Sequence, residues 1–133
     1  MDDLVSVGEV ADFFDLPAST LRYWERRGLI KPHRIGGRRH FDSEQLYRVA
    51  LIRRWRDTGL MSLDDIAAML AGRTEEHDWR DTVTARMATI ASHIDRLNTA
   101  HDYLKYILRC SCAAPAAECG TLRSEVSIPA TEH

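Results

Sequence analysis

The feature that most constrains the fold is a heptad repeat in the C-terminal half of the chain. Such a repeat predicts one continuous helix with an apolar face, from about Trp79 to Arg109, which at 1.5 Å per residue is about 45 Å long. The residues at the repeat positions, called here the seam, are Val83, Met87, Ile90, Ile94, Leu97, His101, Leu104 and Leu108. The helices predicted before it are too short to cover the whole seam, so we expect a second copy of the chain to pack on it as a homodimer. The one polar member, His101, is expected to fix the register of the pair, and pH sensing by its imidazole is the alternative.

Two short helices are predicted near the N-terminus. The stretch "SVGE" has the form of a capping box, so the first helix begins at Ser6. Pro17 suits the start of the second helix because its missing N–H is not needed there, and Gly28 fits a left-handed helix end. Within the second helix, Leu21 and Trp24 are expected to face the core. Two short helices joined by a tight turn are the arrangement of a helix-turn-helix.

A basic hairpin and two further helices are predicted next. Gly36 and Gly37 both accept positive φ, and basic residues flank them on either side, which predicts a two-residue hairpin turn in a wing. A third helix is expected from Ser43 to about Thr58. A fourth begins at the "SLDD" cap and stops near Gly72.

The charge of the chain is unevenly distributed, although its net charge is only −2. From residue 20 to residue 57 there are eleven Lys and Arg against four Asp and Glu, whereas the first nineteen residues carry five acids and no Lys or Arg. A basic block inside an acidic chain indicates a DNA-binding surface. A solvated, salt-bridged helix face is the alternative.

Composition narrows the class of protein. The 133 residues suit one domain, or a small domain with an extension, and no apolar run has the length of a membrane span. The opening "MDDLVSVGEV" lacks the basic and apolar regions of a signal peptide, so we expect a cytoplasmic protein with no membrane partner. Three cysteines in a reducing compartment favour metal binding or thiol chemistry over a disulfide framework.

Together these stretches resemble the MerR family of bacterial transcription regulators. The stretch "SVGEVADFFDLPASTLRYWERRGLIKPHRIGGRRHFD" is similar to that family's winged helix-turn-helix, and "DTGLMSLDDIAAML" to its next helix pair. Pro17 is a departure, because the family more often has a small capping residue there. The resemblance implies a mostly α fold: a winged helix-turn-helix over residues 1–75, a long antiparallel coiled-coil dimerisation helix over 76–109, and a short cysteine-containing effector loop with a polar tail over 110–133.

The resemblance also implies a dimeric, sequence-specific regulator that distorts promoter DNA so that RNA polymerase can engage. The second helix would enter the major groove and the wing would grip the backbone. Arg22 and Arg26, four residues apart, share a helix face, and Arg22 suits a bidentate contact to guanine. The residues expected to contact DNA are Thr20, Arg22, Tyr23, Arg26, Arg34, Arg38 and Arg39.

The cysteines resemble the effector loop of the family's metal sensors. Cys112 and Cys119, or Cys110 and Cys119, would supply one pair of ligands, and the register of the long helices places His77 of the partner near the third position. Thiolate and imidazole ligands suit zinc or another soft divalent or monovalent metal ion. A disulfide switch between the same pairs, and cysteines that only pack with no effector, remain open alternatives. The four-cysteine iron–sulfur cluster of other family members needs one cysteine more than this chain has.

Two further classes of protein fit the sequence less well. An enzyme is not expected, because the sequence offers no nucleophile–base arrangement and no phosphate-binding loop. An excisionase-like architectural protein is the alternative DNA-binding class, because such proteins also use winged helix-turn-helix folds.

Overall fold

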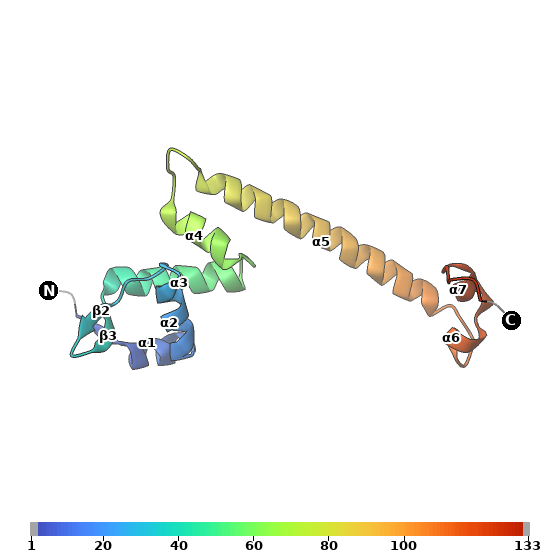
Figure 1. The fold of residues 1–133 in the computed structure, drawn as a ribbon, viewed down its shortest axis with the longest axis horizontal. Coiled ribbons are helices and arrows are strands. Elements are labelled where there is room, and N and C mark those ends of the chain that lie inside the picture. Colours follow the sequence, from blue (N-terminus) through green and yellow to red (C-terminus); the bar gives the residue numbers. More distant parts are fainter. Residues whose placement is uncertain (1–2, 132–133) are drawn as a thin grey trace. The chain divides into compact units, whose positions relative to one another are not determined.

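The computed structural model describes residues 3–131 and divides into two compact units, one up to Arg86 and the other from Met87 onward. In chain order the elements are β1 (Val5–Ser6), α1 (Val7–Phe14), α2 (Ala18–Arg26), β2 (His33–Ile35), β3 (Arg38–Phe41), α3 (Ser43–Asp57), α4 (Leu63–Ala71), α5 (Trp79–Ile107), α6 (Pro115–Glu118) and α7 (Gly120–Ser124). The strands and the first four helices belong to the first unit, and α6 and α7 to the second (Figure 1). Within the described range, no helix combines the length and apolarity that a bilayer span needs.

The helices begin where their caps predict. Ser6 precedes α1 and its hydroxyl accepts the Glu9 N–H at 3.3 Å. Asp42 caps α3 by accepting the Gln45 N–H at 2.8 Å. Ser62 and Asp65 form the complete capping box of α4. Each cap satisfies backbone donors that the first helical turn would otherwise leave unpaired.

One core holds the first unit together. Leu21 and Trp24 of α2 are each 1 % exposed, as predicted, so the inner face of α2 is fixed against the core. Ile66 anchors α4 and is 0 % exposed, a burial that contributes about 1.5–3 kcal/mol. The other buried apolar side chains are Val10, Phe14, Leu16, Leu29, Ile30, Phe41, Val49 and Ile52.

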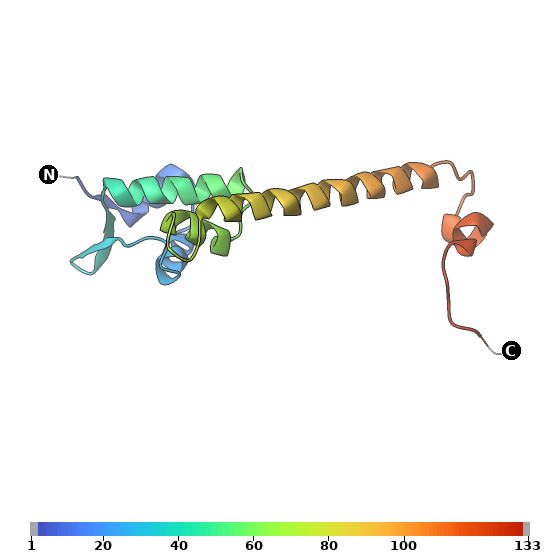
Figure 2. The same cartoon turned by 90° about the horizontal axis from the view of Figure 1, so that it is seen from above.

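The wing is a β2–β3 hairpin within a three-stranded antiparallel sheet. Gly36 and Gly37 lie at its turn with φ of 58° and 79°, a region in which glycine is favoured, so the predicted two-residue turn is confirmed. Figures 1 and 2 show the hairpin projecting from the helices of its unit. The strand β1 was not predicted. It pairs with the edge of β3 opposite to β2, so that β3 is the central strand and the sheet order is β1-β3-β2.

The start of α5 is fixed within the first unit. Arg86 donates from Nε and Nη2 to the Asp65 carboxylate of α4, at 2.9 and 2.5 Å. Thr82, 9 % exposed, lies 2.7 Å from Nε2 of His77 in the loop before α5. The observed helix ends two residues before the predicted end at Arg109.

Most of the seam lies open along α5, and its last residue, Leu108, follows the end of the helix. Val83 and Ile90 are half-buried, whereas the remaining seam residues are exposed: Met87, Ile94, Leu97, His101, Leu104 and Leu108. Leu97 and Leu108 are 68 % and 84 % exposed in the single chain. The helix therefore presents an apolar stripe that its own chain leaves uncovered along the described residues.

Candidate nucleic-acid interface and thiol site

The outer face of α2 carries the polar side chains predicted to contact DNA. Burial of Leu21 and Trp24 turns the opposite side of the helix outward, where Arg22, Tyr23 and Arg26 are exposed. The Arg26 guanidinium lies 5.6 Å from the centre of the Tyr23 ring, a cation–π distance. This face can present two guanidinium groups and a phenol to a groove or a backbone. Thr20, the fourth residue of α2 predicted to contact DNA, is less exposed than these three and is half-buried.

Tyr23 is oriented by two residues that the sequence did not reveal. Arg27 donates from Nη1 to the Tyr23 hydroxyl at 3.1 Å and from Nη2 to Asp64 of α4 at 2.6 Å. The hydrogen bond with Tyr23, followed by attraction to Asp64, raises the pKa of Arg27. Because a guanidinium can only donate, the phenol oxygen accepts, and its single proton remains for another acceptor. Such a hydroxyl is prepared to donate to a phosphate oxygen.

The three wing arginines lie in different environments. Arg39 of β3 donates from Nε to Glu25 of α2 at 2.7 Å, and Arg34 of β2 approaches the same carboxylate at 3.6 Å. Arg38 is exposed next to the turn. The structure therefore brings all seven predicted DNA-contacting residues to α2 and the hairpin, and ties two of the wing arginines to a carboxylate on α2.

The base of the wing is joined to α3. His33, the first residue of β2, lies 2.7 Å from Oδ2 of Asp42, the cap of α3. The bond from His33, and then the bond from the Gln45 N–H, lower the pKa of Asp42. The Lys31 N–H donates to Oε1 of Gln45 at 2.7 Å. These bonds fix where the hairpin leaves the helices.

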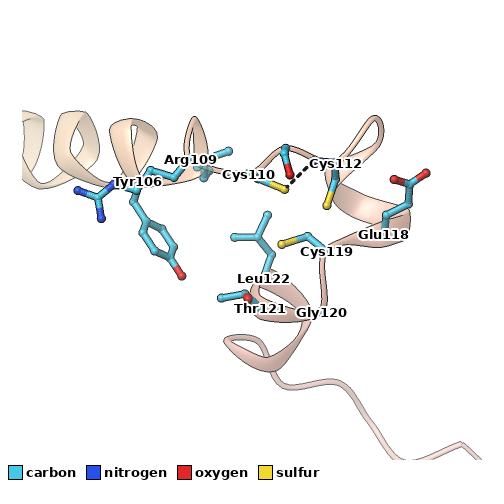
Figure 3. Close-up of a pocket in the computed structure, with 11 residues that line it drawn as sticks. Tyr106, Arg109, Cys110, Cys112, Glu118, Cys119, Gly120, Thr121 and Leu122 are labelled. Atoms are coloured by element: carbon cyan, nitrogen blue, oxygen red, sulfur yellow. Dashed lines mark hydrogen bonds between the residues drawn. The ribbon is translucent and has the colours of Figure 1, made fainter.

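The three cysteines come together after α5. The sulfur atoms of Cys110, Cys112 and Cys119 all lie within 4.8 Å of one another, and each residue is half-buried. Figure 3 shows the thiols directed into a shared space between the end of α5 and α7. The sequence predicted two alternative pairs, and the structure unites both in one trio. The sequence did not predict the short helices α6 and α7, and α6, between Cys112 and Cys119, lies in the segment that returns Cys119 to the other two.

The thiols of Cys110 and Cys112 differ in acidity because Cys110 accepts hydrogen bonds from Cys112. The Cys112 thiol and the Cys112 N–H, the latter at 3.4 Å, donate to the sulfur of Cys110 and lower its pKa. The same bond raises the pKa of Cys112 to about 11. Cys110 is therefore the first of this pair to become a thiolate as the pH rises.

A pocket of about 380 Å³ adjoins the trio. Tyr106 of α5 lines it, and the Tyr106 hydroxyl donates to Oε1 of Glu125 at 2.6 Å, which raises the pKa of the phenol. Leu122 and Glu118 also line the pocket (Figure 3). This bond connects α5 to the segment after α7.

His77 lies in the first unit, outside the thiol trio. It is exposed, and its Nε2 is engaged with Thr82 in the loop before α5. Thr74 accepts the His77 N–H at 3.0 Å and shapes that loop. Its predicted role as a ligand supplied by the partner subunit stays a prediction.

Two family models match the chain. The model described as MerR HTH family regulatory protein matches residues 5–73, and the model described as MerR, DNA binding matches residues 46–107. Among curated relatives, the HTH-type transcriptional regulator MlrA of Escherichia coli is 38 % identical over 82 residues, which are 59 % of this chain and 33 % of the relative. The chain thus spans about a third of the length of the MlrA regulators that it matches. The matched relatives are transcription regulators, not enzymes.

Solved structures of regulators are similar over most of the chain. The transcription regulator PbrR691 of Ralstonia metallidurans CH34, solved in complex with lead(II), is 28 % identical with a TM-score of 0.70, and the match covers 92 % of this chain and 99 % of that one. HiNmlR, a MerR family regulator lacking the sensor domain and bound to promoter DNA, is 25 % identical with a TM-score of 0.55, and the match covers 80 % and 89 %.

Proposed function

Because the chain belongs to the MerR family of transcription regulators, we propose that it works as a homodimer that binds promoter DNA, distorts it for RNA polymerase, and responds to a soft metal ion held by its C-terminal cysteines. DNA binding is proposed from the exposed polar face of α2, which lies beside the wing. Leu21 and Trp24 on the opposite side of α2 are buried in the core and hold the helix in place. HiNmlR, whose fold is similar, was solved bound to promoter DNA, which supports promoter binding by this chain.

The dimer is proposed from the seam on α5. Leu97, Leu104 and Leu108 are between 60 % and 84 % exposed in the single chain, and apolar surface of this extent favours burial against another helix. An antiparallel pair of α5 helices would cover it. Two heads on one dimer would then hold a duplex at two half-sites and keep it bent or undertwisted.

The metal site is proposed from the chemistry of the thiol trio. Three sulfur donors within 4.8 Å of one another, from one chain, suit a thiophilic ion, monovalent or divalent, better than a hard ion such as magnesium. Cys110, Cys112 and Cys119 would be the ligands, and His77 of the partner remains a fourth candidate. The bound ion would supply positive charge that holds the deprotonated sulfur atoms together. PbrR691, solved with lead(II), supports metal response in a chain of this fold.

A thiol-redox response is the second candidate effector. The lowered pKa of Cys110 favours it, because a thiolate is the reactive form of cysteine. Hydrogen peroxide would then be the oxidant: its O–O bond breaks, it takes two electrons and two protons from the Cys110 and Cys119 thiols to leave as two water molecules, and the two sulfur atoms form a disulfide. Metal binding is placed first because the trio offers three donors, where a disulfide uses two.

The DNA-binding proposal is tested with a duplex that the wild-type protein enriches from a random-sequence pool. Arg22→Ala removes the proposed base contact, so we expect loss of selective binding in a footprint, with a discrimination loss of about 1–3 kcal/mol, in a chain that still melts cooperatively. Arg73→Ala, in the loop after α4, is the charge-matched control. An Arg22→Ala footprint equal to that of the wild type would remove this residue from the interface.

A further inference from the structure

The wing places two arginines against each other. Arg34 of β2 lies directly opposite Arg39 of β3 in the hairpin register. Side chains opposite one another across an antiparallel pair share a face of the sheet, and like charges at such positions repel. A hairpin with this pair needs a compensating charge to hold its shape.

Glu25 of α2 provides that charge. Arg39 donates to Oε1 of Glu25 at 2.7 Å, and Nη2 of Arg34 lies 3.6 Å from Oε2. The Glu25 and Arg39 side chains are 26 % and 23 % exposed, whereas Arg34 remains 55 % exposed. A pair that is shielded from water holds its geometry better than an open surface pair. These three residues, called here the Glu25 bridge, connect both strands of the wing to α2.

Arg38 lies on the other side of the hairpin. It is paired in register with Ile35, one residue along from Arg39, and successive side chains of a strand point to opposite faces. It is exposed beside the turn formed by Gly36 and Gly37. Arg38 is thus presented on the hairpin face that does not meet Glu25.

We infer that Glu25 is a positioning residue that sets the selectivity of DNA binding. This inference rests on the proposed DNA interface of α2 and the wing. The bridge fixes the wing to α2, keeps Arg39 and in part Arg34 from phosphates, and leaves Arg38 as the wing's principal phosphate contact. Phosphate contacts raise affinity for all sequences alike, whereas a fixed angle between wing and helix holds α2 in one register on its base edges.

The test compares Glu25→Gln with the wild type on the enriched duplex and on unrelated DNA, across a series of salt concentrations. The variant releases both arginines, so we expect tighter binding to unrelated DNA. Its salt dependence should steepen by about 0.9 in the logarithmic slope for each arginine that gains a phosphate, and the preference for the enriched duplex should fall about tenfold. Glu75→Gln, the same charge change in the loop before α5, should leave the slope and the preference unchanged.

Arg39→Gln distinguishes a role of Arg39 in the Glu25 bridge from a direct contact between Arg39 and a phosphate. It is also the variant to use if Glu25→Gln does not fold. The bridge predicts a lower preference for the enriched duplex with an unchanged salt slope, because Arg39 does not reach the backbone. A slope reduced as much as in Arg38→Gln would show that Arg39 itself binds phosphate and would overturn the inference. A Glu25→Gln protein with wild-type slope and preference would also overturn it. Failure of the wild-type chain to enrich any duplex would instead refute the proposed function.

Discussion

The three cysteines show how much single residues depend on their neighbours. Cys110 receives two hydrogen bonds from Cys112, so two chemically identical side chains two residues apart have pKa values displaced in opposite directions. The spacing of the cysteines predicted a site but left its membership open. Their union in one trio depends on the reversal of the chain through α6, between Cys112 and Cys119, which a short stretch rich in alanine did not signal.

At this scale we predict that Cys119→Ser strongly weakens soft-metal binding. Loss of a direct ligand should cost more than the roughly 10- to 100-fold that outer-shell changes cost, so we expect at least about a 100-fold weaker affinity. His77→Ala tests the fourth candidate: a loss comparable with that of Cys119→Ser is expected if His77 of the partner is a ligand, and an unchanged affinity if the three sulfur atoms bind the ion alone. Sulfur-to-metal charge-transfer absorption during titration with lead(II) or copper(I) measures both. A Cys119→Ser chain that binds as the wild type does would contradict the thiol site, and a large loss in His77→Ala would assign the histidine as a ligand.

At the scale of elements, the caps determine where the helices begin, and the charges between elements determine how they are joined. Ser6, Asp42 and Ser62 could be identified from sequence because a cap and its partner lie within three residues. The pairing of β1 with β3 and the contacts of Glu25 and Asp64 could not, because each joins residues that are distant along the chain. These long-range contacts become visible only once the chain is folded.

The contact between α4 and α5 gives a prediction that depends on pH. Burial raises the pKa of Asp65, but the bonds from Arg86 and from the Ser62 N–H outweigh it, so the pKa is lowered from 3.8. A carboxyl whose folded pKa is depressed adds stability above its unfolded value and loses it as the pH falls through the folded value. We therefore expect Asp65→Asn to destabilise the chain by about 1 kcal/mol at pH 7, because it weakens both the helix cap and the ion pair with Arg86. Near pH 2, the stability of the variant should differ little from that of the wild type.

Thermal unfolding at pH 7, 4 and 2 measures this difference. Asp12→Asn, which removes an exposed carboxylate of α1, is the control and should cost little at any of these pH values. A penalty for Asp65→Asn that persists unchanged at pH 2 would show that the charge of Asp65 is not what stabilises the contact.

At the scale of the whole molecule, the seam links the fold to the proposed function. The heptad spacing predicted both the long helix and its apolar stripe, and the structure places Ile94, Leu97 and Leu104 in the open along α5. The partner that covers them cannot be derived from one chain. A homodimer remains the proposal because a duplex with two half-sites needs two heads.

We predict that Leu97→Glu separates the dimer. Leu97 would be buried once from each chain, and two lost side-chain burials of about 1.5–3 kcal/mol each raise the dissociation constant at least about 100-fold. Thr99→Glu adds the same charge two residues away, off the seam, and should remain dimeric. Sedimentation equilibrium over a micromolar range compares the two, and a Leu97→Glu protein that stays dimeric would place the interface elsewhere.

The most direct test of the central claim is the stoichiometry of the complex with DNA. Sedimentation velocity of the wild-type chain, with a fluorescent label on the duplex enriched from random DNA, gives the number of chains bound to each duplex. Two heads joined through α5 predict two chains per duplex and no complex containing a single chain at intermediate concentrations. Binding of one chain at a time, or sedimentation of the duplex unchanged at micromolar protein, would contradict the account.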